Sequence, residues 1–218
     1  MNQPPLQEIQ ELLRDTIIFG GSTQDVTDVL NYIEKNAPFF RSNNPLPASA
    51  NTNNVEETPL TLAVNHDRQD IVDILLATPR INVNQPNGAG QTPLEIAKTR
   101  PDTGANRTIR EHIIGTLLKS YIIDSDGNAI TNLLQNNNDF DINAPLFQSN
   151  GITPLILAII LYDQDNVDSQ NVVDSLLLSE DTDVDVNTPR QTDGNTPLMF
   201  AIMLGHNSTM VETLLSQP

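Results

Sequence analysis

The stretch Thr-Pro-Leu-Met-Phe-Ala, residues 196–201, decides the fold, because its Thr-Pro-Leu-x-x-Ala spacing recurs along the chain. A spacing that repeats in this way is typical of repeat architectures, in which each unit packs on its neighbours and the array forms a binding surface. The copies of the pattern begin at Thr58, Thr92, Thr153 and Thr196.

Each copy has the residues that start a helix. A threonine just before a helix accepts a hydrogen bond from a free N–H group of the first turn. Proline at the first helical position loses no hydrogen bond, because that N–H has no helical partner. The leucine then packs inward, and the alanine one turn later lets a neighbouring helix approach closely. The pattern therefore predicts four short helices that start near these threonines.

A second pattern follows three of the copies: two apolar residues, two spacers and then Leu-Leu. This spacing marks one face of another helix. An extended segment and turn residues come next, as in Val184–Asn187 and Thr192–Asn195. The predicted unit is a short helix, a longer helix and a protruding hairpin-like loop. Together with a similar pattern in the middle of the chain, the longer helices are expected over residues 68–77, 107–120, 168–178 and 207–216.

The combined motifs resemble the ankyrin repeat over roughly residues 51–217. The resemblance implies an all-α fold, an ankyrin-like helical repeat solenoid with protruding hairpin loops. One departure is consistent: the family often has histidine directly after the leucine, where it ties neighbouring repeats together. We therefore expect the repeats to rely more on apolar stacking, because that position holds Thr61, Glu95, Ile156 and Met199.

The expected organisation has two parts. Residues 1–50 carry two apolar stripes at helical spacing and are predicted to be an N-terminal helical capping region, because the end of a repeat stack must be covered. Residues 51–218 are expected to hold about four clear repeats and a degenerate repeat or three-helix module near 101–145. Residues 41–57, rich in Asn, Pro and Ser, are expected to form a long mobile loop.

Composition narrows the classes of partner. The net charge of −17 disfavours binding to nucleic acid or to an anionic membrane. The longest apolar run, residues 155–161, is too short to span a membrane, and no signal peptide is evident. The absence of cysteine suits a reducing compartment. We expect a cytoplasmic protein, of the producing cell or of a host cell if the chain is a secreted effector.

The sequence has few motifs that would support catalysis or the binding of a metal or phosphate. No histidine pair has metal-ligand spacing, and no phosphate loop or nucleophile elbow occurs. The acidic clusters at 163–168 and 181–185 lack the glycine and glutamate of a calcium loop. Five basic residues within 98–119 are either a patch for an acidic partner or a solvated helix face. We therefore expect no enzyme activity, no cofactor and no metal.

The resemblance implies that the chain binds a protein partner on the concave ankyrin face. Its residues would come from the hairpin tips and from the exposed sides of the first helices, with Tyr162 as the preferred anchor because aromatic residues dominate binding hot spots. An alternative is the N-terminal recognition part of a longer enzyme or toxin, including a host-directed bacterial effector. The candidate partner-binding residues are Asn65, Asn87, Gln91, Lys98, Gln148, Asn150, Tyr162, Gln191, Asp193 and Met203.

The helix that carries Met210, Val211, Leu214 and Leu215 raises a separate expectation. One side of its apolar stripe should pack on the helix that starts near Thr196. The other side should be covered by a further domain or by another molecule.

Overall fold

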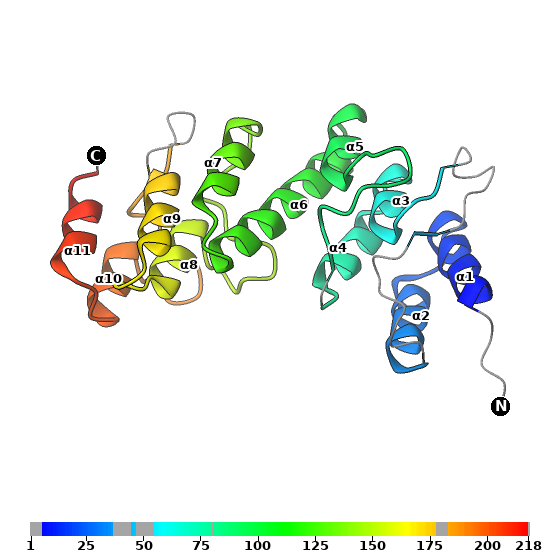
Figure 1. The fold of residues 1–218 in the computed structure, drawn as a ribbon, viewed down its shortest axis with the longest axis horizontal. Coiled ribbons are helices and arrows are strands. Elements are labelled where there is room, and N and C mark those ends of the chain that lie inside the picture. The colour runs from blue at the N-terminus through cyan, green and yellow to red at the C-terminus, as the bar shows by residue number, and fades with distance from the viewer. Residues whose placement is uncertain (1–5, 37–44, 47–54, 80, 178–182, 218) are drawn as a thin grey trace. The chain divides into compact units, whose positions relative to one another are not determined.

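A computed structural model describes residues 6–36, 45–46, 55–79, 81–177 and 183–217 (Figure 1). Within these ranges the regular secondary structure is helical, apart from one isolated bridge between Leu46 and Glu57, and turns and loops connect the helices. Two compact units are formed, Met1–Ile113 and Ile114–Pro218, and α6 supplies residues to both. The helices are α1 (Leu6–Ile18), α2 (Thr23–Asn36), α3 (Pro59–Asn65), α4 (Gln69–Ala77), α5 (Pro93–Thr99), α6 (Gly104–Ile123), α7 (Gly127–Gln135), α8 (Pro154–Leu161), α9 (Val167–Leu177), α10 (Pro197–Met203) and α11 (Ser208–Leu215).

The four predicted helix starts are confirmed. Each motif threonine is the residue before the helix, its side chain accepts a backbone N–H three residues later, and its proline opens the helix. At α3 and α5 the contact is reciprocal, since Thr61 and Glu95 accept from the backbone N–H of the capping threonine at 2.8 and 2.7 Å. We call α3, α5, α8 and α10 the first helices. The longer helices are confirmed as α4, α6, α9 and α11.

In the first unit, α1 packs on α2 and α3, and α2 packs on α4. Most of the apolar stripes predicted for this region are buried, at Ile9, Leu13, Val26, Leu30 and Ile33. Leu12 of the first predicted stripe is 56% exposed, and the buried Ile17 was not among the predicted residues. Arg68 adds polar contacts, because its guanidinium donates to the carbonyls of Ile17 and Gly21 at 3.0 and 2.7 Å. The helical pair α1–α2 is thus joined to α3–α4 much as one repeat is joined to the next. A capping role for residues 1–50 stays a prediction.

A buried carboxylate holds the first hairpin turn in place. Glu57 is 4% exposed, and it accepts hydrogen bonds from the side-chain amides of Asn65 and Asn87 at 3.0 and 3.2 Å. The backbone N–H of Leu46 donates to the Glu57 carbonyl at 2.6 Å, and the Leu46 side chain is fully buried. The described ends of the predicted 41–57 loop are therefore ordered, and the rest of that prediction lies outside the described residues.

In the second unit, α7 packs on α9, α8 packs on α9 and α10, and α10 packs on α11. Its core is almost wholly aliphatic, with Ile156, Ile159, Val173 and Leu176 fully buried. The segment 101–145 contributes α6 and α7. The predicted reliance on apolar stacking holds at one of the four positions where the family often has histidine, because Ile156 is buried there. Thr61 and Glu95 instead make polar helix caps, and Met199 is 49% exposed.

Replacing Ala158 by leucine should overpack the contact between α8 and its neighbours. Ala158 is 3% exposed, and extra methylenes in a packed interior cost about 1–3 kcal/mol. We expect the urea unfolding midpoint to fall for Ala158→Leu. The matched control is Ala77→Leu at the exposed end of α4, which should leave the midpoint unchanged. Equal midpoints for Ala158→Leu and the parent would contradict close packing at this site.

Replacing Thr58 by alanine should remove the cap of α3. Its hydroxyl accepts from the Thr61 N–H at 3.1 Å and lies 3.1 Å from the Thr61 hydroxyl in a buried pair. We expect a loss of about 1–2 kcal/mol in the free energy of unfolding, because the first-turn N–H is left without a partner. Thr58→Ser keeps the oxygen and should recover most of this loss. If serine is as destabilising as alanine, the hydroxyl is not the stabilising group.

Candidate protein-binding surface

The hairpin tips hold six of the ten predicted contact residues, and the tip at 87–91 has one buried and one exposed member of this set. The Asn87 side chain is 8% exposed and is held by Glu57, while its Oδ1 accepts the backbone N–H groups of Ala89 and Gln91 at 3.0 Å each. Gln91 is exposed. Asn87 therefore shapes the turn, and Gln91 is the residue that the tip displays.

The next two tips lie side by side in the second unit. Gln148 and Asn150 are exposed and adopt left-handed backbone conformations, with φ of 53° and 54°. The Gln191 N–H donates to the Gly151 carbonyl at 3.4 Å, which joins the two tips. The structure thus brings together three predicted residues, Gln148, Asn150 and Gln191, on neighbouring loops.

The tip that carries Asp193 is stiffened by an ion pair. Arg190 donates through both its Nε and a terminal nitrogen to the Asp193 carboxylate, and its guanidinium lies 5.0 Å from the centre of the Phe200 ring. The Arg190 contact, helped by the Asn195 N–H at 3.1 Å, lowers the pKa of Asp193 to about 2. The Asp193 carboxylate therefore serves the loop itself, and the loop is fixed against α10.

Tyr162 is half-buried at the end of α8. Its hydroxyl donates to the Gln170 side chain at 3.0 Å, and its ring meets the His206 ring edge-on at 5.1 Å between centres. His206 in turn donates from Nε2 to the Ile159 carbonyl at 2.7 Å. Part of the tyrosine is thus used to join α8 to the turn after α10, and the remaining ring surface borders the exposed side of these helices.

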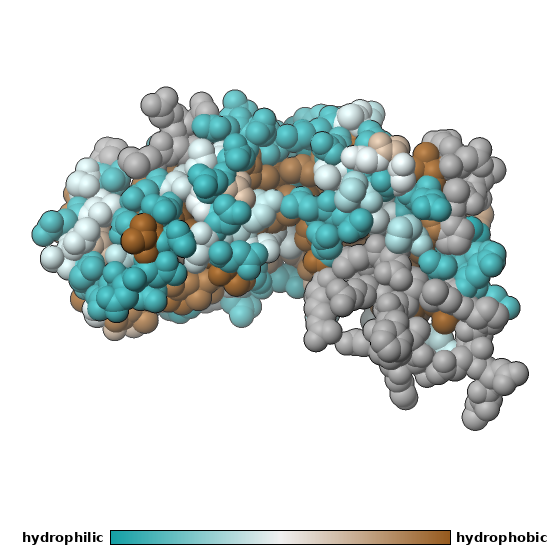
Figure 2. Space-filling view, in the orientation of Figure 1, coloured by the Kyte–Doolittle hydropathy of each residue, from teal (hydrophilic) through white to brown (hydrophobic). Residues whose placement is uncertain are grey.

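The exposed side of α8 and α10 is unusually apolar. Figure 2 shows hydrophobic surface along the lower edge of the region of α8 and α10. The residues seven and eight places after Thr196 are Met203, the last residue of α10, and Leu204, which follows it; they are 68% and 49% exposed. Leu161, eight places after Thr153 at the end of α8, is 45% exposed. Of these, sequence reasoning named only Met203. The signal for the others was present, because apolar residues occupy both positions in both helices.

The equivalent positions in the first unit are polar. They are Asn65 and His66 at the end of α3, and Thr99 and Arg100 at the end of α5. Asn65 is half-buried against Glu57, and Lys98 on α5 is exposed. Burial, followed by the Arg100 charge, lowers the pKa of His66. At these positions the first unit is therefore polar, whereas the second unit is apolar.

Local aspartates neutralise much of the basic group at 98–119. Arg107 and Arg110 both bind Asp102, at 2.8 and 2.9 Å, and Arg100 forms an ion pair with Asp67. The Arg107 hydrogen bond lowers the pKa of Asp102. These contacts favour the interpretation of a solvated, internally paired helix face over that of a patch for an acidic partner.

Two further properties of the described ranges bear on the site. No three histidine or acidic side chains gather there as a metal site would require. None of the helices in these ranges is both long enough and apolar enough to cross a membrane.

Comparison with known proteins identifies the repeats. A family model for ankyrin repeats in three copies matches residues 120–218, and the single ankyrin repeat model matches residues 44–88. No curated protein sequence matches the chain. Among solved structures, EF0377, an ankyrin repeat protein, is 20% identical with a TM-score of 0.41, over 94% of this chain and 96% of that one.

A second similar structure is the complex of Bd0816, a predatory endopeptidase from Bdellovibrio bacteriovorus, with the immunity protein Bd3460. The matched chain is 19% identical with a TM-score of 0.37, over 95% of this chain and 98% of that one.

The two family models together cover more than half of the sequence, and their ranges include the capped helices α3, α8 and α10, while α5 lies between them. Ankyrin repeats are generally modules of protein–protein interaction and are generally not enzymes. The chain belongs to the ankyrin-repeat family.

Proposed function

We propose that this protein recognises a protein partner through the concave ankyrin face of residues 114–218. We call this the recognition face; it consists of the apolar residues Leu161, Met203 and Leu204, the ring of Tyr162, and the tips that carry Gln148, Asn150 and Gln191. The observation that carries the proposal is the exposure of the apolar residues at positions that are polar in α3 and α5.

Exposed apolar side chains of this size have a free-energy cost that binding removes. Full burial of a leucine or methionine side chain stabilises a complex by about 1.5–3 kcal/mol, and gathered apolar surface marks interaction sites. The polar tips suit the rim of an interface, where contacts to solvent persist. Tyr162 and Met203 lie at the apolar part, where binding energy usually concentrates.

The recognition face is largely preformed. The left-handed turns at 148 and 150, the joined tips and the Arg190–Asp193 pair fix the loops before any partner arrives. A preformed surface loses less conformational entropy on binding, so more of the contact energy appears as affinity. We propose a recognition or scaffolding role on this basis.

In the first unit, Gln91 and Lys98 are the exposed members of the predicted set. We propose that they supply polar contacts for protein binding by the first unit. Asn65, Asn87 and Asp193 would contribute indirectly, because their side chains hold the backbone from which the exposed residues project.

Leu161→Glu and Met203→Glu should weaken partner capture while leaving the fold intact, since both side chains are exposed. We expect the yield of cross-linked partner to fall at least about tenfold for each variant, as for central interface residues. The measurement is quantitative mass spectrometry after photo-cross-linking in cell extract, with equal amounts of the parent and each variant.

The matched control is Val167→Glu, because Val167 is 75% exposed on α9 and lies outside the recognition face. It should capture the same proteins at the parent yield. Unchanged capture by both Leu161→Glu and Met203→Glu would show that this face is not the one that binds.

A further inference from the structure

A second set of positions in the first helices distinguishes α10 from its neighbours. These positions lie three and six places after the motif threonine. In α3 they are Thr61 and Val64, in α8 they are Ile156 and Ile159, and all four are fully buried. The next first helix packs on each of these helices, α5 on α3 and α10 on α8.

In α10 the same positions are apolar but exposed. Met199 is 49% exposed and Ile202 is 63% exposed. The sequence of α10 therefore has the character of a helix on which another helix packs, whereas the equivalent exposed residues of α5 are the charged Glu95 and Lys98.

The second helices show the same difference. In α4 the second member of each apolar pair is buried, at Val72 and Leu76. In α11 the corresponding Val211 is half-buried and Leu215 is 64% exposed. The predicted open side of α11 is thus confirmed at Leu215, while Met210 and Leu214 are buried as expected. We call the exposed residues Met199, Ile202, Val211 and Leu215 the end face.

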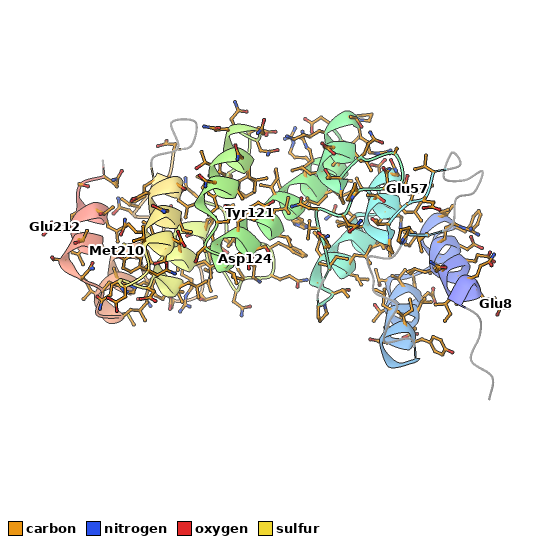
Figure 3. The ribbon with its side chains drawn as sticks, in the orientation of Figure 1. Glu8, Glu57, Tyr121, Asp124, Met210 and Glu212 are labelled. Atoms are coloured by element: carbon orange, nitrogen blue, oxygen red, sulfur yellow. The ribbon has the colours of Figure 1, made fainter. Side chains whose placement is uncertain are left out.

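A negatively charged residue, Glu212, lies on the same helix as Val211 and Leu215. Glu212 is exposed, and Figure 3 shows its side chain pointing outward from α11, on the side away from α9. By register with the apolar pairs, Glu212 corresponds to Asp73 of α4. In the first unit Asp73 is met by His112 of α6, whose Nδ1 lies 2.6 Å from the carboxylate.

The α4–α6 contact therefore serves as an internal template for what an end face accepts. The helix opposite Asp73 carries a basic residue at 112, with buried apolar residues beside it at Ile109 and Ile113. An occupant of the end face should share these features: an apolar stripe at helical spacing and a basic group opposite Glu212.

The negative charge of the surrounding chain also favours a basic partner. Residues 151–218 contain ten acids, and their basic side chains are Arg190, which is bound to Asp193, and His206, which donates to the Ile159 carbonyl. A second copy that docked through its own end face would bring a second Glu212 and further acids to this surface, without a base to meet them. Like charges brought together in this way disfavour the complex.

We propose that the end face is a docking site for an amphipathic helix of a partner protein that carries basic residues beside its apolar stripe. Its residues are not members of the recognition face, although Ile202 is next to Met203 in α10, and the proposal does not depend on that face. The geometry of the contact would be that of one repeat helix on the next, with Met199, Ile202, Val211 and Leu215 covered and Glu212 paired.

Two fluorescein-labelled helical peptides of about 20 residues, long enough to form a helix, test the proposal. They share one leucine–alanine stripe and differ only in carrying lysine or glutamate beside it. Fluorescence anisotropy with the full chain measures the Kd of each at low and high salt. We expect the lysine peptide to bind at least about fivefold more tightly than the glutamate peptide, with the preference reduced at high salt.

Variants of the chain assign the site. Ile202→Glu combined with Leu215→Glu should abolish binding of the lysine peptide, and Glu212→Gln alone should remove most of the preference for it. Leu161→Glu, on the recognition face, is the control and should leave both Kd values unchanged. Far-UV circular dichroism of each variant checks that the helices persist, which is expected because the altered residues are exposed.

Several outcomes would overturn the proposal. These are equal Kd values for the two peptides, failure of both to bind, or loss of binding in Leu161→Glu. A further contradicting outcome can be measured by sedimentation of the chain alone. If the parent is a dimer and the Ile202→Glu, Leu215→Glu variant is a monomer, the end face binds a second copy. Loss of partner capture in Met203→Glu alone would concern the recognition face, so failures of the two proposals are distinguishable.

Discussion

The shortness of the first helices is the constraint on which the rest of the structure depends. They are seven or eight residues long, and isolated helices of this length are unstable in water. The Thr-Pro start answers part of this problem, because the threonine satisfies an N–H of the first turn and the proline has none to satisfy. The remaining stability must come from neighbours, so each first helix is folded because others pack on it.

This dependence divides the surface of every first helix into two kinds of position. In α3 and α8 the residues three and six places after the threonine are buried and belong to the core, whereas in α5 and α10 the same positions are exposed. The residues seven and eight places after it are polar for Thr58 and Thr92 and apolar for Thr153 and Thr196. Leu161 and Met203 are exposed and belong to the proposed recognition face, whereas Ile156 and Ile159 are buried in the core, although all four are apolar and lie within two short helices.

The sequence predicted the helices well because their signals are local. A capping threonine, a proline and a Leu-Leu face act within one or two turns of backbone, and the structure has each of them where expected. The site was harder to predict because its residues are defined by tertiary contacts. Asn87 looked like a displayed tip residue, but its amide is turned to a buried glutamate thirty residues away in the chain. The Tyr162 ring likewise packs against His206, and its hydroxyl donates to Gln170.

A repeat protein offers comparisons within one chain that a single globular core does not. Glu212, Asp73 and Asp174 occupy the same register, yet they differ in what meets them: Asp73 receives His112, and Asp174 receives the amide of Gln170 at 2.8 Å. The acidic group is thus a recurring feature, which the next helix meets at Asp73 and which a residue of the same helix meets at Asp174. Where apolar neighbours are exposed around such a carboxylate, as at Glu212, the chemistry of a fitting partner can be described in advance, because the contact of His112 with Asp73 shows which groups complete it.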